Sequence, residues 1–137
     1  MKSIMYHYVR DFDPELPFFN SLSKKSFKKQ VDLFNKSKIL VDEKQFENNL
    51  PEIILTFDDG FKDHIYVAEE LRKKKVIGIF FISTYPVTEN NFLDVHKAHL
   101  INGKVGGEQA LKALNEYLHK NKILDFIDRD EEKKFKH

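Results

Sequence analysis

In the first 85 residues, short apolar runs typical of strands alternate with segments in which apolar residues recur at helical spacing. Three short apolar runs have the length and the β-branched and aromatic content of strands: Ser3–Val9, Ile53–Phe57 and Val76–Ser83. Between these runs, apolar residues recur at helical spacing over Ser23–Asn35 and Phe61–Lys75. Because strands that alternate with helices form βαβ units, this order predicts an α/β fold with a parallel sheet and right-handed crossovers.

Each of the two predicted helices has one apolar face, which we expect to be buried. In the first helix this face carries Phe27, Val31 and Phe34. In the second it carries Phe61, Ile65, Ala68 and Leu71. His64 falls on the polar side of the second helix, so we expect its imidazole to be exposed.

The segment between the first helix and the second strand predicts two shorter elements. Lys38–Val41 is a candidate short strand. Asp42–Gln45 has the form of a capping box, which predicts a short helix with Phe46 directed inward.

Strand patterns stop after Tyr85 and Pro86. Phe92–Ile101 predicts a short helix, and Gly103–Gly107 predicts a flexible break. A second helix over Glu108–Lys120 places Leu111, Leu114 and Leu118 on one face. Residues 125–137 form a mixed charged tail. We therefore expect a single domain over residues 1–137, with a β/α core at 1–85 and a mainly helical extension at 86–137.

Composition narrows the classes of partner and site. With 23 Lys and Arg against 22 Asp and Glu, the chain has no strong net field that would favour nucleic acid or an acidic membrane surface. Cysteine is absent, so disulfides and thiolate zinc sites are excluded, and any metal must be held by oxygen and imidazole. The chain passes directly from Met1–Ser3 into an apparent strand, without a signal peptide or an apolar run long enough for a membrane span. We expect a cytoplasmic location.

Two adjacent carboxylates, Asp58 and Asp59, end the apolar run of Ile53–Phe57 and are followed by Gly60. Like charges at the end of a buried strand repel each other and lose hydration, unless a cation, a base function or a hydrogen-bonding loop compensates. One carboxylate can hold a metal while its neighbour takes a proton from water. An ordinary turn, with Asp59 capping the next helix, is the alternative explanation.

Four segments in order resemble the polysaccharide deacetylase (NodB-homology) family: Met5–Val9, Phe27–Val31, Thr56–Gly60 and Gly78–Ile82. The resemblance implies a distorted (β/α) barrel, of which this chain supplies the first part. It implies metal-dependent removal of acetyl groups from N-acetylated sugars or polysaccharides, with zinc as the expected divalent metal. By the same resemblance, Asp58 is the general base and Asp59 is a metal ligand.

The family's later motif, in which three residues separate two metal-binding histidines, has no match in this chain. His96 and His99 are separated by only two residues. Residues three apart on a helix can share a face, so metal binding by this pair stays open. The interpretation that we favour is that both are hydrogen-bonded or solvent-exposed helical histidines.

His7 lies near the end of the first predicted strand, where barrel active sites collect their side chains. We assign it as a candidate substrate-binding residue, with a backbone-bonded rim histidine as the equal alternative.

For the chain as a whole, two interpretations compete with an active enzyme. One is a truncated or inactive fragment, and the second is a carbohydrate-binding or scaffold protein without catalysis. Sheet surfaces that later β/α units would cover predict marginal stability, self-association and an incomplete catalytic domain.

Overall fold

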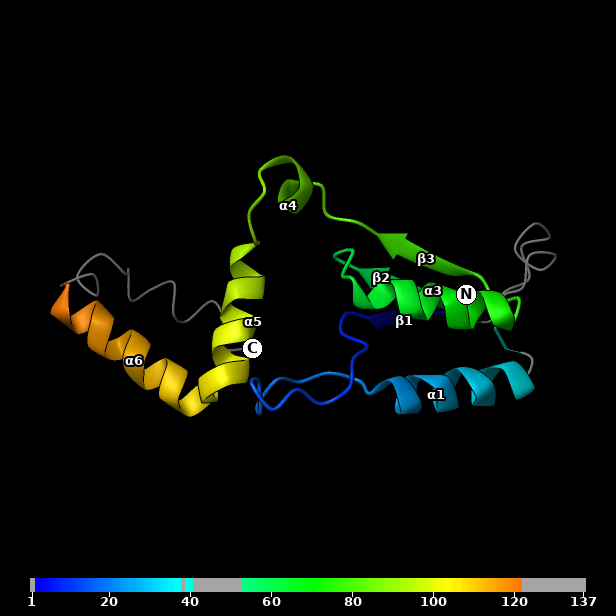
Figure 1. Cartoon of the computed structure of the whole chain (residues 1–137), viewed down its shortest axis with the longest axis horizontal. Helices are drawn as coiled ribbons and strands as arrows, with labels where there is room; N and C mark the ends of the chain where they lie inside the picture. Colours follow the sequence, from blue (N-terminus) through cyan, green and yellow to red (C-terminus); the bar gives the residue numbers. More distant parts are fainter. Residues whose placement is uncertain (1, 38, 41–52, 122–137) are drawn as a thin grey trace.

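A three-stranded parallel sheet forms the centre of the computed structural model, which describes residues 2–37, 39–40 and 53–121. The strands are β1 (Lys2–Tyr6), β2 (Ile53–Asp58) and β3 (Gly78–Phe81), in the order β1-β2-β3 (Figure 1). The α/β class and the parallel sheet predicted from the sequence are confirmed. The distorted barrel is a finer expectation that these strands do not show.

Both pairings are in parallel register, so the carboxyl ends of the strands lie at one edge of the sheet. Tyr6 lies opposite Phe57, and Asp58 lies opposite Phe81. Leu40 forms an isolated parallel bridge with Ile53, where a short strand was expected. The predicted capping box and helix at residues 42–46, like the charged tail at 125–137, lie outside the described residues.

Five helices are described: α1 (Lys24–Lys36), α3 (Asp63–Lys73), α4 (Tyr85–Thr88), α5 (Asp94–Val105) and α6 (Gly107–Lys120). α1 and α3 lie alongside the strands of the sheet, while α5 lies beyond the end of the sheet and α6 extends away from it (Figure 1). The Ser23 side chain accepts a hydrogen bond from the Ser26 amide and caps α1, since the first amides of a helix have no partner within the helix.

The core joins one face of the sheet to α1 and α3. Its fully buried members are Val9, Phe27, Val31, Leu55, Phe57 and Val67. Phe57 is the centre of an aromatic cluster, because its ring stacks on Tyr6 and Phe80 at centroid distances of 5.4 and 4.8 Å. Phe27 of α1 meets both Tyr6 and Phe57 edge-on, as aromatic quadrupoles favour.

The buried face of α3 differs from the expected one. The helix begins at Asp63, and its buried residues are His64, Val67, Glu70 and Leu71. Ile65 is 63% exposed, so the expected apolar face was wrong except at Leu71. The expectation that His64 is exposed was also wrong: it is 5% exposed and packs between the rings of Phe57 and Phe61. Aromatic neighbours and a hydrogen bond to the His7 carbonyl offset the burial of this polar ring.

The C-terminal helices also depart from the sequence pattern. α5 continues through Gly103 to Val105, and the break is confined to Gly106, whose φ is +82°. The leucines of α6 do not reach a core within the described residues, since Leu111 and Leu114 are 58% and 52% exposed. Periodicity therefore identified the helix but not what it packs against.

We expect Phe57→Leu to lower the free energy of unfolding by about 1–2 kcal/mol, because it leaves a cavity and removes aromatic contacts. Phe81→Leu is the matched control on the neighbouring strand. Phe81 is 56% exposed, so its substitution should change stability by less than about 0.5 kcal/mol. Urea unfolding followed by circular dichroism measures both, and equal losses would contradict the central position of Phe57.

Candidate functional site

The turn after β2 holds its backbone in an unusual conformation. Asp59 and Gly60 have φ of +74° and +68°, in the left-handed region that non-glycine residues seldom adopt. A Cβ at Gly60 would lie 2.8 Å from the Ile82 Cγ2 atom, so the turn also passes close to the chain after β3. Aspartate is among the non-glycine residues that turns place in this region most often.

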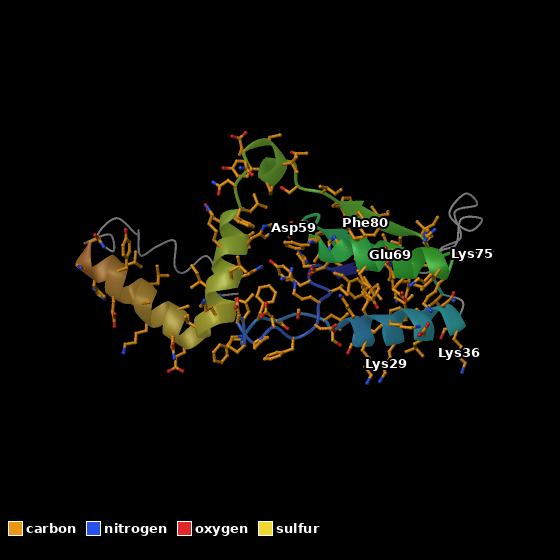
Figure 2. The ribbon with its side chains drawn as sticks, in the orientation of Figure 1. Lys29, Lys36, Asp59, Glu69, Lys75 and Phe80 are labelled. Carbon is orange, nitrogen blue, oxygen red and sulfur yellow. The ribbon has the colours of Figure 1, made fainter. Side chains whose placement is uncertain are left out.

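Asp59 does not cap the following helix. The N-cap residue of α3, immediately before its first residue Asp63, is Lys62, and no side chain caps this end of the helix. Instead, Asp59 Oδ2 faces two imidazoles, at 3.2 Å from His96 Nε2 and 3.8 Å from His7 Nε2. Figure 2 shows Asp59 at the end of the sheet that faces α5. The capping explanation for Asp59 is therefore wrong, whereas the turn that it predicted is present at Asp59 and Gly60.

Two buried polar atoms at this turn lack hydrogen-bond partners. They are Asp58 Oδ1 and His96 Nε2, and the whole His96 residue is 6% exposed. Unpaired buried polar atoms are uncommon in native proteins and call for an explanation such as a missing ion or a catalytic role. His96 is buried, so the exposed alternative was wrong for this residue, whereas a histidine paired with a polar group is compatible with the 3.2 Å approach of its Nε2 to Asp59 Oδ2.

The docking of α5 depends on a close approach at Gly103. A Cβ there would lie 2.6 Å from the Phe19 ring, and the Phe18 amide donates to the Gly103 carbonyl at 2.9 Å. Near the N-terminal end of α5, the centroid of the His96 ring lies 4.9 Å from that of the Phe61 ring. These contacts hold the His96 imidazole at the end of β2.

His7 follows β1, and a hydrogen bond to its backbone carbonyl fixes its position. The His64 ring nitrogen Nε2 lies 2.7 Å from the His7 carbonyl oxygen. A carbonyl only accepts, so Nε2 carries a proton and donates it, while Nδ1 is buried and has no hydrogen-bond partner. The His7 side chain is 37% exposed and is free to contact a ligand.

His99 faces another part of the site. Its Nδ1 lies 3.0 Å from the Tyr8 hydroxyl. Burial, followed by the negative charge of Asp59, raises the pKa of Tyr8 above its usual range, while Arg10 opposes the shift. Arg10 itself is bound to Asp63 at 2.6 Å, which ties the loop after β1 to the first turn of α3.

A mixed cavity of about 550 Å³ lies beside His7. The end of β1, the loop around Phe19 and one side of α5 form its walls, which include Tyr8, His99 and Asn102. Its lining includes neither Asp58 nor Asp59. Aromatic faces beside amide and imidazole groups suit a polar ring with apolar faces, such as a sugar.

The side chains around Asp59 can be compared with the needs of a metal ion. Within residues 2–37, 39–40 and 53–121, no three histidine, cysteine, aspartate or glutamate side chains are already placed to hold a metal ion. The Asp59 carboxylate and the His96 imidazole are zinc ligands of the usual kinds, so these two side chains could together contribute to holding such an ion. The sequence left metal binding by His96 and His99 open, and the structure places only His96 beside Asp59.

Comparison with known proteins gave no match to a family model, a curated protein or a solved structure. Among the helices of the described residues, none is both long enough and apolar enough to cross a membrane.

We expect Gly103→Ala to destabilise the chain by about 1–3 kcal/mol through overpacking against Phe19, although alanine is the better helix former. Gly107→Ala at the start of α6 is the matched control. Nothing lies within 4 Å of a Cβ at that position, so the substitution should be neutral or stabilising by up to about 1 kcal/mol. Urea unfolding of both variants measures the difference. A stabilised Gly103→Ala variant would show that α5 does not dock as described.

Proposed function

We propose that this chain is a metal-dependent hydrolase that removes acetyl groups from N-acetylated sugars. The observation that carries the proposal is the approach of His96 Nε2 to Asp59 Oδ2, 3.2 Å apart, beside a second carboxylate. The sequence resemblance to polysaccharide deacetylases supports the same reaction. It also supports the finer expectation of a distorted (β/α) barrel.

Asp59 and His96 would hold the metal. A bound divalent ion of the zinc type would polarise the acetyl carbonyl and acidify the attacking water. Both side chains are held before any ion arrives, Asp59 by the left-handed turn and His96 by the packing of α5. This preorganisation favours binding, because little side-chain freedom is lost when the ion enters.

Asp58 is the proposed general base. It lies next to Asp59 in the chain, as the last residue of β2. Its carboxylate would take the proton of the attacking water, as a general base does, and one of its oxygens is buried without a hydrogen-bond partner. Water then adds to the acetyl carbon, the carbon–nitrogen bond breaks, and the products are acetate and the free amine of the sugar.

His7 is the proposed substrate contact. It borders both the Asp59 carboxylate and the 550 Å³ cavity, so a sugar in the cavity would have one edge near the carboxylates. The aromatic ring of Tyr8 and the amide of Asn102 offer an apolar face and a hydrogen-bonding group to that sugar.

The test is acetate release from N-acetylglucosamine oligomers in the presence of zinc. We expect activity that a chelator abolishes and that Asp58→Asn lowers by at least about 100-fold, since general bases contribute roughly that much or more. Asp94→Asn is the matched control, because the Asp94 side chain on α5 is 98% exposed. It should retain full activity. Acetate release that survives both chelation and Asp58→Asn would contradict the proposal.

A carbohydrate-binding protein without catalysis is the second candidate. The mixed cavity beside His7 favours it, since that cavity would bind a sugar whether or not the carboxylates act on it. Saturable binding of the oligomers without acetate release would favour this candidate over the enzyme. The cytoplasmic location expected from the sequence stays a prediction.

We propose that the chain associates with itself through the exposed apolar side chains on and beside the sheet. Met5, Phe81 and Ile82 are 59%, 56% and 64% exposed among the described residues. We expect the dimer fraction in sedimentation velocity to rise with concentration and to fall in Phe81→Lys, because lysine removes apolar contact area. Val87→Lys on α4 is the control, since Val87 is 77% exposed but lies outside the sheet. Equal effects of the two variants would exclude the sheet as the interface.

A further inference from the structure

We infer that Phe18 is a stacking platform for a sugar ring, and that the substrate is an oligosaccharide that contacts the chain through at least two of its rings. Phe18 lines the same 550 Å³ cavity as His7. The inference rests on the proposed function, because it extends the substrate of that site. It adds a binding residue that takes no part in the chemistry.

The Phe18 ring has one covered face and one open face. A Cβ at Gly106 would lie 3.6 to 3.7 Å from the Cγ, Cδ1 and Cδ2 atoms of this ring. A point almost equally far from three neighbouring atoms of a flat ring lies over the face of that ring. Phe18 is nevertheless 63% exposed. Since one face rests on Gly106, the opposite face is the exposed one.

The loop that carries Phe18 is held against α5. The Phe18 amide donates to the Gly103 carbonyl at 2.9 Å. The next residue, Phe19, packs against Gly103 and meets the Tyr8 ring edge-on at a centroid distance of 4.6 Å. The two adjacent phenylalanines therefore differ in function, because Phe19 anchors the loop and Phe18 presents an aromatic face. A ring that is held before the ligand arrives loses little freedom on binding.

The chemistry around Phe18 suits a sugar ring. A pyranose carries C–H groups on its faces and hydroxyls around its edge. The negative face of an aromatic ring attracts such C–H groups, and stacking removes apolar surface of both rings from water. Asn20 and Asn102 line the same cavity, and their amides can donate and accept hydrogen bonds at the edge of the sugar.

The position of Phe18 along α5 requires a second sugar ring. Phe18 contacts this helix at Gly103, whereas His96, which lies beside the Asp59 carboxylate, is seven residues earlier in the same helix. At a rise of about 1.5 Å per residue, the two points are about 10 Å apart along the helix. One pyranose ring does not cover that distance. The ring near the carboxylates and the ring stacked on Phe18 are therefore different rings of one oligomer.

Single-tryptophan variants test the platform directly, because the chain contains no tryptophan. Phe18→Trp keeps an aromatic face at the platform. We expect the N-acetylglucosamine tetramer to change its emission until binding saturates, since a stacked indole loses contact with water. Phe12→Trp is the matched control. Phe12 lies in the same loop and is 74% exposed, but it lines a separate cavity of about 180 Å³, so its emission should not change.

Calorimetry with the same tetramer, in the presence of zinc, measures what the platform contributes to affinity. Phe18→Ala should weaken binding by at least about fivefold, the cost typical of truncating an aromatic anchor, whereas Phe12→Ala should leave it unchanged. Phe18→Leu should also weaken binding, because leucine is apolar but has no aromatic face. The tetramer should bind more tightly than the monomer to the unaltered chain, but not to Phe18→Ala.

The outcomes separate this inference from the proposed function. Tetramer binding that leaves the Phe18→Trp emission unchanged, or that Phe18→Ala does not weaken, would overturn the inference and leave the hydrolase proposal standing. Stacking at Phe18 without zinc-dependent acetate release would support the inference and overturn the hydrolase. Absence of any tetramer binding would overturn both. Circular dichroism distinguishes loss of binding from loss of the fold, and the two tryptophan variants decide the question if Phe18→Ala does not fold.

Discussion

The parallel pairing of β1 with β2 is the constraint on which the rest of the site depends. Because the two strands run in the same direction and in register, the residues that follow them leave the sheet at one edge. His7 and Asp59 are 52 positions apart in the chain, but this pairing brings their side chains to 3.8 Å. An antiparallel pairing would place them at opposite ends of the sheet. The stack of Tyr6, Phe57 and Phe80 stabilises the three strands in this register.

The second requirement is a helix that crosses the end of the sheet. α5 has no buried apolar stripe, since its buried residues are His96 and Gly103. It is held where the missing side chain of Gly103 admits the Phe19 ring, and where Phe61 lies beside His96. The imidazole is therefore part of the packing between helix and sheet. The His96 Nε2 nitrogen lies beside the Asp59 carboxylate, and a metal ion or a proton between the two groups would stabilise this arrangement.

The sequence predicted the features that depend on local pattern. Strand and helix periods identified β1, β2, α1 and α3, and the apolar run before Asp58 and Asp59 identified the central strand. The position of His96 could not be predicted in this way, because it depends on the contact between Gly103 and Phe19, which are far apart in the chain. Likewise, His64 was assigned to the wrong side of α3, because the buried face depends on the aromatic rings around it.

The central claim is the proposal that His96 Nε2 and the Asp59 carboxylate, 3.2 Å apart, bind a metal ion together. Nitrogen chemical shifts of the histidine side chains, recorded by NMR during a zinc titration, test it most directly. The account predicts a shift of His96 Nε2 that saturates at one zinc per chain, while His64 Nε2 keeps the shift of a protonated nitrogen throughout. An unchanged His96 signal at saturating zinc would contradict the account.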